Sequence, residues 1–230
     1  VGFVRSVGQI NAQTDLRSVD QIEQAITQND MRVADQSKVD ALHQLIDQAK
    51  KDGDSLGGVI QVVAENVPAG LGSYVSWDTK FDGQLAGAVM AINAIKGVSF
   101  GMGFDATRHP GSEVMDQITY DEQHGWSRLS DHLGGFEGGM TNGMPIILNA
   151  AMKPIPTLYK PLQTVDINTK QKLKANVERS DTTAIVAASV VVESVVAIEL
   201  AKKITDTFAS ANLNRLQDEV ARYRQELKHY

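Results

Sequence analysis

The sequence of 230 residues contains no cysteine, which excludes disulfide bonds, thiolate metal sites and cysteine nucleophiles. It also lacks an excess of positive charge, because 22 lysines and arginines stand against 28 aspartates and glutamates, giving a net charge of −6. A general nucleic-acid partner is therefore not predicted, since such partners need a basic surface. A local basic pocket for a phosphorylated ligand remains compatible with this balance.

Long hydrophobic runs are missing too, and none approaches the roughly 18 residues of a membrane-spanning helix. The longest nearly apolar run, from Ala184 to Val192, continues toward Lys203 with Glu193 and Glu199 as interruptions. Its apolar residues follow a helical period, which predicts a largely buried helix over residues 182–203. We expect no membrane partner, and because no secretory leader is visible we expect a cytoplasmic protein.

The composition is that of a globular protein, with 42% hydrophobic and 22% charged residues in one large domain or two small ones. Helical and extended patterns alternate along the chain, which predicts a mixed α/β (α+β) fold. Because Val1 begins an extended segment with no preceding turn, the chain is expected to be a fragment that starts in mid-fold. Helices are predicted over 14–30, 37–51, 81–95 and 209–230, and extended segments over 1–10, 59–64, 98–100, 145–152 and 163–169.

Residues 101–133 differ from the rest, because they are rich in Gly, Asp, His and Met and follow neither a helical nor a strand period. We predict one long loop here, and loops of this length usually act as lids or binding loops or are disordered. The segment holds His109, His124 and His132, but no two of them have the i, i+4 spacing of a helical metal site. No metal site is therefore predicted.

Arg179, Ser180 and Asp181 precede the predicted helix over 182–203, and two interpretations of them are open. In the first, Asp181 caps the helix by accepting hydrogen bonds from first-turn N–H groups, and Arg179 is a solvated neighbour. In the second, Arg179 binds an anionic ligand bidentately near the positive end of the helix, and the Asp181 carboxylate lies beside it as a base.

Two further segments have the chemistry of a site for a phosphate and a flat ring. Lys153 follows a predicted strand and carries a mobile positive charge, and Thr157 adds a hydroxyl group. Pro154 and Pro156 restrict the backbone, so that both side chains keep constant directions. Gly138, in a glycine-rich segment, allows the backbone to lie against a flat ligand, although such turns also form hairpins without any ligand.

Several motifs stand in a fixed order along the chain: Asp54-Ser55-Leu56-Gly57-Gly58, Ile92-Asn93-Ala94-Ile95-Lys96-Gly97, Leu133-Gly134-Gly135-Phe136-Glu137-Gly138-Gly139, Lys153-Pro154-Ile155-Pro156-Thr157 and Arg179-Ser180-Asp181. In this order and spacing, the chain resembles the C-terminal part of chorismate synthases. The resemblance covers 1–208 as the C-terminal portion of a single domain, with 101–133 as a long active-site loop. Residues 209–230 are a C-terminal amphipathic helix or tail outside it, and the family's N-terminal part is absent.

The resemblance implies a β-α-β sandwich, incomplete at its N-terminus, with sheets flanked by helices in a subunit of a homotetramer. It also implies a lyase of the shikimate pathway that converts 5-enolpyruvylshikimate 3-phosphate to chorismate and phosphate by an anti 1,4-elimination. The family requires reduced FMN without net redox change, and NADPH or an external flavin reductase is implied as the means of reducing it.

The same resemblance assigns roles to individual positions. Arg179 is implied as a substrate-binding residue, and Asp181 matches the catalytic carboxylate that helps to remove the proton. The implied flavin contacts are Asn93, Ala94, Gly138, Lys153, Pro154, Ile155, Pro156, Thr157 and Arg179.

Two features depart from the family. Asp131 stands where many members have asparagine, and its charge would weaken the binding of an anionic cofactor placed near it. The family's two catalytic histidines lie in the missing portion, so His109, His124 and His132 receive no role. We therefore expect the 230 residues alone neither to fold fully nor to turn over.

Two other functions remain open from the residues alone. A flavin-dependent oxidoreductase would use the same glycine-rich, lysine-containing pocket, but it would consume reduced flavin stoichiometrically. A non-enzymatic module for oligomerisation or for binding a phosphorylated ligand would not need Asp181 for any turnover.

Overall fold

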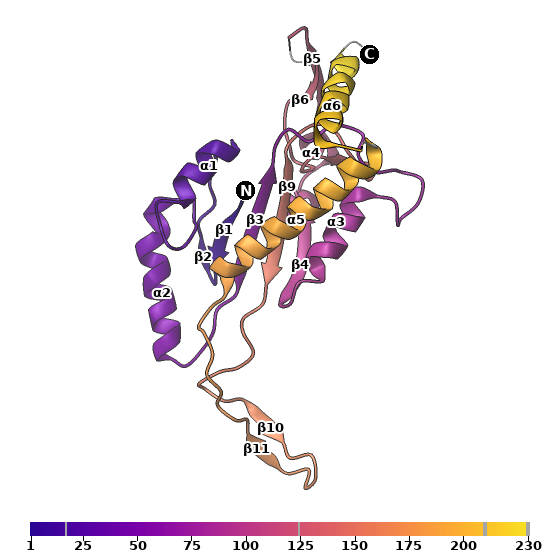
Figure 1. The fold of residues 1–230 in the computed structure, drawn as a ribbon. Coiled ribbons are helices and arrows are strands. Elements are labelled where there is room, and N and C mark those ends of the chain that lie inside the picture. The colour runs from indigo at the N-terminus through magenta and orange to yellow at the C-terminus, as the bar shows by residue number, and fades with distance from the viewer. Residues whose placement is uncertain (17, 124, 209–210, 229–230) are drawn as a thin grey trace.

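The centre of the molecule is an antiparallel sheet of five strands in the order β2-β1-β3-β9-β4 (Figure 1). The structure is a computed structural model, and it describes residues 1–16, 18–123, 125–208 and 211–228. The mixture of helices with antiparallel strands confirms the predicted α+β fold class. The five strands are β1 (Gly2–Val7), β2 (Ile10–Asn11), β3 (Gly58–Ala64), β4 (Ile95–Phe100) and β9 (Ile146–Met152).

The two faces of this sheet differ because successive side chains of a strand point to opposite sides. Ile60 and Val62 of β3 lie on the face that forms the main core, and Leu148 of β9 pairs with Val62 there. Gln61 and Asn149 lie on the opposite face, where the Gln61 side chain donates to Asn149 Oδ1 at 2.8 Å. One face is thus apolar, and the other is polar at its centre.

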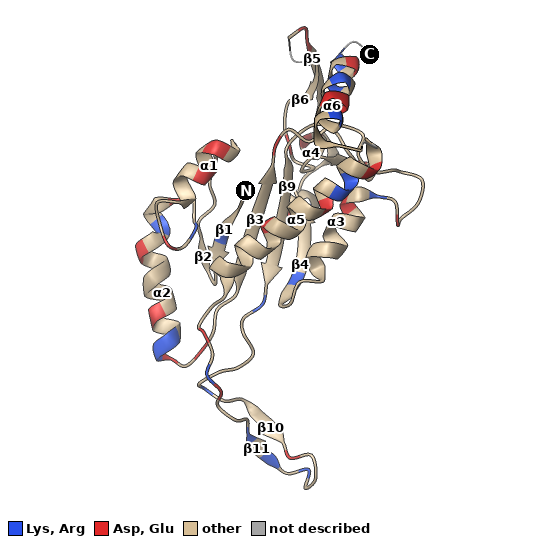
Figure 2. Ribbon diagram, in the orientation of Figure 1, with Lys and Arg blue, Asp and Glu red and all other residues tan. Residues whose placement is uncertain are grey.

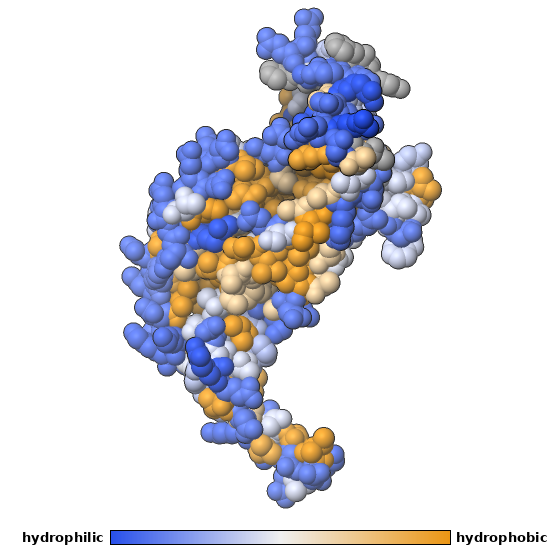
Figure 3. Space-filling view, in the orientation of Figure 1, coloured by the Kyte–Doolittle hydropathy of each residue, from blue (hydrophilic) through white to orange (hydrophobic). Residues whose placement is uncertain are grey.

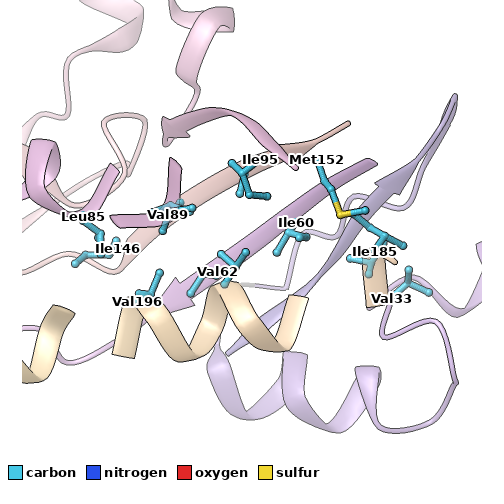
Figure 4. Packing of buried hydrophobic residues seen from close by; sticks show 14 of the residues in the cluster. Val33, Ile60, Val62, Leu85, Val89, Ile95, Ile146, Met152, Ile185 and Val196 are labelled. Atoms are coloured by element: carbon cyan, nitrogen blue, oxygen red, sulfur yellow. The ribbon is translucent and has the colours of Figure 1, made fainter. Parts of the chain in front are cut away.

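Helices α3 (Phe81–Met90) and α5 (Ile185–Thr207) pack on the apolar face (Figures 1 and 4). A helix buries one side when its apolar residues recur every three or four positions. The residues buried in this way are Phe81, Leu85 and Val89 on α3, and Ile185, Ser189, Val192 and Val196 on α5.

The outer side of α5 differs from the prediction. The helix itself is confirmed, but it is not largely buried, because Val190, Val191 and Ile198 are 45%, 47% and 54% exposed. Figure 3 shows hydrophobic surface across the middle of the molecule, where α5 crosses in Figure 1. The other sheets among the described residues have two strands each, so one large sheet of the expected sandwich is present.

The N-terminal helices lie at the β1 side of the sheet. The predicted helix over 37–51 is confirmed as α2 (Val39–Lys51), which follows the short 3-10 helix η1 (Gln36–Lys38). The predicted helix over 14–30 is shorter, because α1 (Val19–Ile26) begins only after Ser18. Its buried side packs on the polar face of the sheet in a small second core of Phe3, Ile22, Ile26, Ala34 and Val63.

The prediction of one irregular loop over 101–133 was wrong. Each element in it spans only four to six residues, too few to produce a recognisable period in the sequence. His124 lies outside the described residues. The elements are η2 (Gly103–Arg108), α4 (Gly111–Val114), β5 (Ile118–Asp121) and β6 (Gly125–Arg128).

Two segments extend from the body (Figure 1). The hairpin of β10 (Gln163–Val165) and β11 (Lys172–Lys174) forms an arm at one end, where a strand was predicted over 163–169. At the other end, α6 (Leu213–Lys228) carries charges of both signs (Figure 2) and is attached by Tyr223, whose hydroxyl donates to the Ala69 carbonyl at 3.0 Å. None of the helices among the described residues has the length and apolar content needed to cross a membrane.

Candidate active site

Strand β9 ends next to the beginning of β4, and this places Lys153 beside the turn that precedes β4. Ile95 pairs with Met152, and the backbone N–H of Lys153 donates to the Ala94 carbonyl at 2.9 Å. Pro154 follows and has no N–H group, so the strand ladder cannot continue. The structure thus brings together two of the segments that the sequence assigned to a ligand.

The turn at Asn93 and Ala94 joins α3 to β4. Ala94 has a φ of 72°, in the left-handed region that residues with a β-carbon rarely adopt. This conformation directs the Ala94 carbonyl toward Lys153, while the Asn93 side chain remains exposed. The turn therefore presents one polar side chain beside the end of β9.

The segment from Lys153 to Thr157 runs along the surface at this end of the sheet. Lys153 Nζ donates to the Pro154 carbonyl at 3.2 Å, and the side chain is half-buried with no ion pair among the described residues. The carbonyl of Ile155 accepts a hydrogen bond from the Ser55 hydroxyl at 2.6 Å. Pro156 is exposed and Thr157 is half-buried, so both remain accessible to a ligand.

Arg179 and Asp181 are exposed, and neither side chain has a hydrogen-bond or ion-pair partner in the part of the chain that the structure describes. The capping interpretation of Asp181 was wrong, because α5 begins at Ile185 and Ala184 occupies its N-cap position. The Thr183 hydroxyl instead accepts from the Ile185 N–H at 3.3 Å. Asp181 is too far before the first turn to cap it, which leaves its carboxylate available.

A turn preceding β3 connects this motif to the Lys153 segment. The Leu56 N–H donates to the Thr182 carbonyl at 2.8 Å, one residue after Asp181. Ser55, in the same turn, donates its hydroxyl hydrogen bond to the Ile155 carbonyl. The sequence showed Ser55 and Leu56 only as part of a matching motif, and their separation from Ile155 and Thr182 along the chain hid these contacts.

Gly138 lies at the opposite end of the sheet, in the hairpin of β7 (Phe136–Glu137) and β8 (Met140–Thr141). This hairpin adjoins the start of β9, whereas Lys153 follows the last residue of β9. Gly138 and Lys153 are therefore separated by roughly 20 Å along the strand. Gly138 has a φ of 62°, and no atom of the described residues lies within 4 Å of the position that a β-carbon would take. The structure of one chain therefore does not bring Gly138 together with Lys153.

Asp131 also lies away from Lys153. It lines a pocket of about 630 Å³ near the Phe100 end of β4, together with Arg5 and Gln61 from the polar face of the sheet. The effect of the Asp131 charge on an anionic cofactor placed near it stays a prediction.

Asp116 organises the turn beside this pocket, a role that its sequence position did not reveal. Its side chain is fully buried, and it accepts from the Ser130 hydroxyl at 2.6 Å and from the N–H groups of His132 and Leu133 at 2.8 and 3.0 Å. Burial acts to raise the pKa of Asp116, but these hydrogen bonds outweigh burial and hold the pKa below its ordinary value. The group is ionised and satisfied, as in a structural site.

The histidines contribute no metal centre within the described ranges, where no three His, Cys, Asp or Glu side chains lie together as metal ligands would. His109 lies near Glu113, with its Nδ1 at 3.2 Å from Glu113 Oε2. His132 lies beside Asp116, with its Nδ1 at 4.0 Å from Asp116 Oδ1. Both contacts are those of surface or structural histidines.

Comparison with known proteins identifies relatives along the whole chain. A family model described as chorismate synthase matches residues 1–205. Chorismate synthases of Lactiplantibacillus plantarum and Limosilactobacillus fermentum are 64% and 60% identical to the chain, and each alignment covers 100% of the chain and 59% of the relative. A solved structure described as chorismate synthase has a TM-score of 0.84 at 35% identity, covering 100% of this chain and 63% of its own. The chain thus spans about three fifths of the length of these relatives.

Proposed function

Because the chain belongs to the chorismate synthase family, we propose that the protein containing it is a shikimate-pathway lyase that converts 5-enolpyruvylshikimate 3-phosphate to chorismate and phosphate. One observation carries the proposal. The segment that contains Lys153 and the residue after the Arg179–Asp181 motif both accept hydrogen bonds from the same turn at one end of the sheet. Neither Lys153 nor Arg179 has a carboxylate partner among the described residues. This end of the sheet can therefore accept anionic groups next to a free carboxylate.

The residues present also fit reduced FMN, which we propose as the cofactor. A cofactor phosphate needs cationic and hydroxyl donors, and Lys153, Thr157 and Arg179 supply them. The exposed Asn93 side chain adds a polar group at the adjacent turn. Gly138 lies at the far end of the sheet, so its proposed flavin contact is not part of this group of residues within one chain.

The roles of the residues follow from their chemistry. Lys153 and Thr157 hold the cofactor phosphate, and Arg179 binds an anionic oxygen of the substrate or cofactor bidentately. When bound, reduced FMN would supply an electron-rich ring to the elimination. The Asp181 carboxylate helps to remove the proton that the substrate loses as phosphate leaves, so that a double bond forms with no net oxidation.

The proposal is tested with the purified full-length protein, reduced FMN and 5-enolpyruvylshikimate 3-phosphate under anaerobic conditions. We expect chorismate and phosphate in equal amounts while the absorbance of reduced flavin stays constant. Stoichiometric loss of reduced flavin would instead favour a flavin-dependent oxidoreductase. No turnover and no flavin binding would overturn the proposal in favour of a non-enzymatic module.

We further propose that the protein is a homotetramer and that NADPH or an external flavin reductase keeps the flavin reduced. The 230 residues alone are proposed to be inactive, and the apolar residues exposed on the outer side of α5 support this, because such surfaces are normally covered. Sedimentation of the full-length protein tests the assembly. Assays of the 230 residues alone with reduced FMN test their inactivity, and assays of the full-length protein with oxidised FMN, with and without NADPH, test how the flavin is reduced.

A further inference from the structure

One turn, residues 53–57, contacts both halves of the proposed site, and we call it the bracket. The Ser55 hydroxyl donates to the Ile155 carbonyl at 2.6 Å, in the middle of the Lys153–Thr157 segment. The next residue, Leu56, donates its N–H to the Thr182 carbonyl at 2.8 Å, directly after the Arg179–Asp181 motif. Two consecutive residues therefore hold two segments that are distant from each other along the chain.

The bracket is itself fixed to the sheet. Gly57 is buried so closely against the end of β9 that a β-carbon would lie 2.2 Å from the Met152 carbonyl oxygen. Its own carbonyl accepts from the Gly8 N–H at 2.9 Å, in the turn between β1 and β2. The Gly53 carbonyl accepts from the Lys160 N–H at 3.0 Å, at the root of the β10–β11 arm. These contacts fix the bracket to the sheet, beside the two ends of the β10–β11 arm.

The chain between Lys153 and Thr182 needs contacts outside itself to fix the positions of its two ends. It projects as the β10–β11 arm, and an isolated two-stranded hairpin is at best marginally stable. The arm alone therefore cannot fix where its two ends lie. The Ser55 and Leu56 contacts set the separation of the Lys153 segment from the Arg179–Asp181 motif.

We propose that Ser55 is a positioning residue for cofactor binding, acting through the Ile155 carbonyl on the directions of Lys153 and Thr157. This inference rests on the proposed function. Ser55 is only 7% exposed and its hydroxyl already donates to the protein, so it acts through the backbone of its partner segment and not by direct contact with a ligand. A loosened Ile155 would release the cation and the hydroxyl group that bind the phosphate.

The test compares FMN dissociation constants of full-length variants by flavin fluorescence. Ser55→Ala should raise the dissociation constant about fivefold, the effect of one lost hydrogen bond, and turnover should recover at saturating FMN. Ser189→Ala is the control, because Ser189 is fully buried on α5 and its hydroxyl also donates to a backbone carbonyl, that of Val186 at 2.7 Å, besides accepting from Arg32 Nε at 3.2 Å. This control should bind FMN within about twofold of wild type, although it too loses a buried hydrogen bond.

Asp54→Ala keeps the test decisive if Ser55→Ala does not fold. The exposed Asp54 carboxylate accepts from the Ser55 N–H at 2.8 Å, so its removal should loosen the bracket and raise the dissociation constant about twofold. Wild-type affinity in every folded bracket variant overturns the inference alone, as does an equal loss in Ser189→Ala. A wild-type protein that binds no FMN overturns the proposed cofactor and this inference together.

Discussion

The backbone N–H of Lys153 donates to the carbonyl oxygen of Ala94 at 2.9 Å, and Ala94 presents this carbonyl from a left-handed conformation with a φ of 72°. A residue with a β-carbon pays roughly 1–2 kcal/mol for this conformation. The strain is located where the α3–β4 turn meets the end of β9. The turn therefore fixes the position of Lys153 while holding a strained backbone.

Replacing Ala94 tests this strain. Ala94→Gly removes it but makes the unfolded chain more flexible, so the free energy of unfolding should rise by about 0.5 kcal/mol. Ala94→Val places a β-branched residue in the same conformation and should lower it by about 1 kcal/mol or more. Urea unfolding of full-length variants without flavin measures both. A valine variant as stable as the glycine variant would contradict the prediction.

Arg179 offers a test of binding that is separate from folding. Its side chain is exposed and has no partner among the described residues, so Arg179→Ala should change the free energy of unfolding by less than about 0.5 kcal/mol. The dissociation constant for FMN or for the substrate should rise tenfold or more, because a charge-assisted interaction is lost. Arg179→Lys should restore the affinity only in part, since an ammonium group cannot bind bidentately. Calorimetric titration measures both affinities.

Asp181 is predicted to act in turnover and not in folding or cofactor binding. Asp181→Asn keeps the shape of the side chain but removes its ability to accept a proton, and kcat should fall by about 10²–10⁴-fold. The FMN dissociation constant should stay within about twofold, because the Asp181 side chain has no hydrogen-bond or ion-pair partner among the described residues. Unchanged kcat in this variant would instead support the non-enzymatic alternative.

The fold was predictable wherever a segment was long enough to show a period. Apolar residues at helical spacing indicated α2 and α3, and the run before Met152 indicated β9. The short elements between Gly103 and Arg128 were missed, because four to six residues do not establish a period. The burial of α5 was overestimated, because the apolar residues all around it did not show that only one side meets the sheet.

The candidate site was predictable as a set of residue types but not as a geometry. The residue types of Lys153, Arg179 and Asp181 indicated anion binding and a base from the sequence alone. Asp181 seemed suited to capping because the sequence could not show that α5 begins only at Ile185. The role of Ser55 depends on a contact with Ile155, which lies about a hundred residues away, and no local pattern records such a contact.

The ion pair of Arg128 and Glu137 should stabilise the hairpin that carries Gly138. Two bonds of 2.8 and 3.1 Å join the guanidinium to both carboxylate oxygens, and the Arg128 side chain is only 12% exposed. The hydrogen bond from Arg128 also lowers the pKa of Glu137. Glu137→Gln should lower the free energy of unfolding by about 1 kcal/mol, after allowance for solvent screening at the half-exposed carboxylate.

Asp105→Asn is the control for this pair. Asp105 and Arg108 are joined at 3.3 Å through side chains that are 55% and 80% exposed. Such surface pairs contribute little, so the change should be below about 0.5 kcal/mol. Urea unfolding of the two variants side by side gives the comparison, and equal losses would refute the special role of the Arg128 pair.

Asp116 should be a larger contributor to stability, because its buried carboxylate accepts three hydrogen bonds. In Asp116→Asn, the amide nitrogen would face N–H and hydroxyl donors that need an acceptor. Leaving such a buried group unsatisfied costs about 1–3 kcal/mol, so the free energy of unfolding should fall by this amount near neutral pH. Ser130→Ala removes only one of the donors and should cost less.

The pH dependence of this loss follows from the lowered pKa of Asp116. A carboxyl group whose folded pKa lies below its ordinary value of 3.8 contributes its stability above that value. The contribution is lost as the pH falls through the folded pKa, because the folded state must then take up a proton that the unfolded state already holds. The difference in unfolding free energy between wild type and Asp116→Asn should therefore be constant from about pH 7 to pH 5 and shrink below pH 3.8. A difference that grows on acidification would show that Asp116 is protonated in the folded protein.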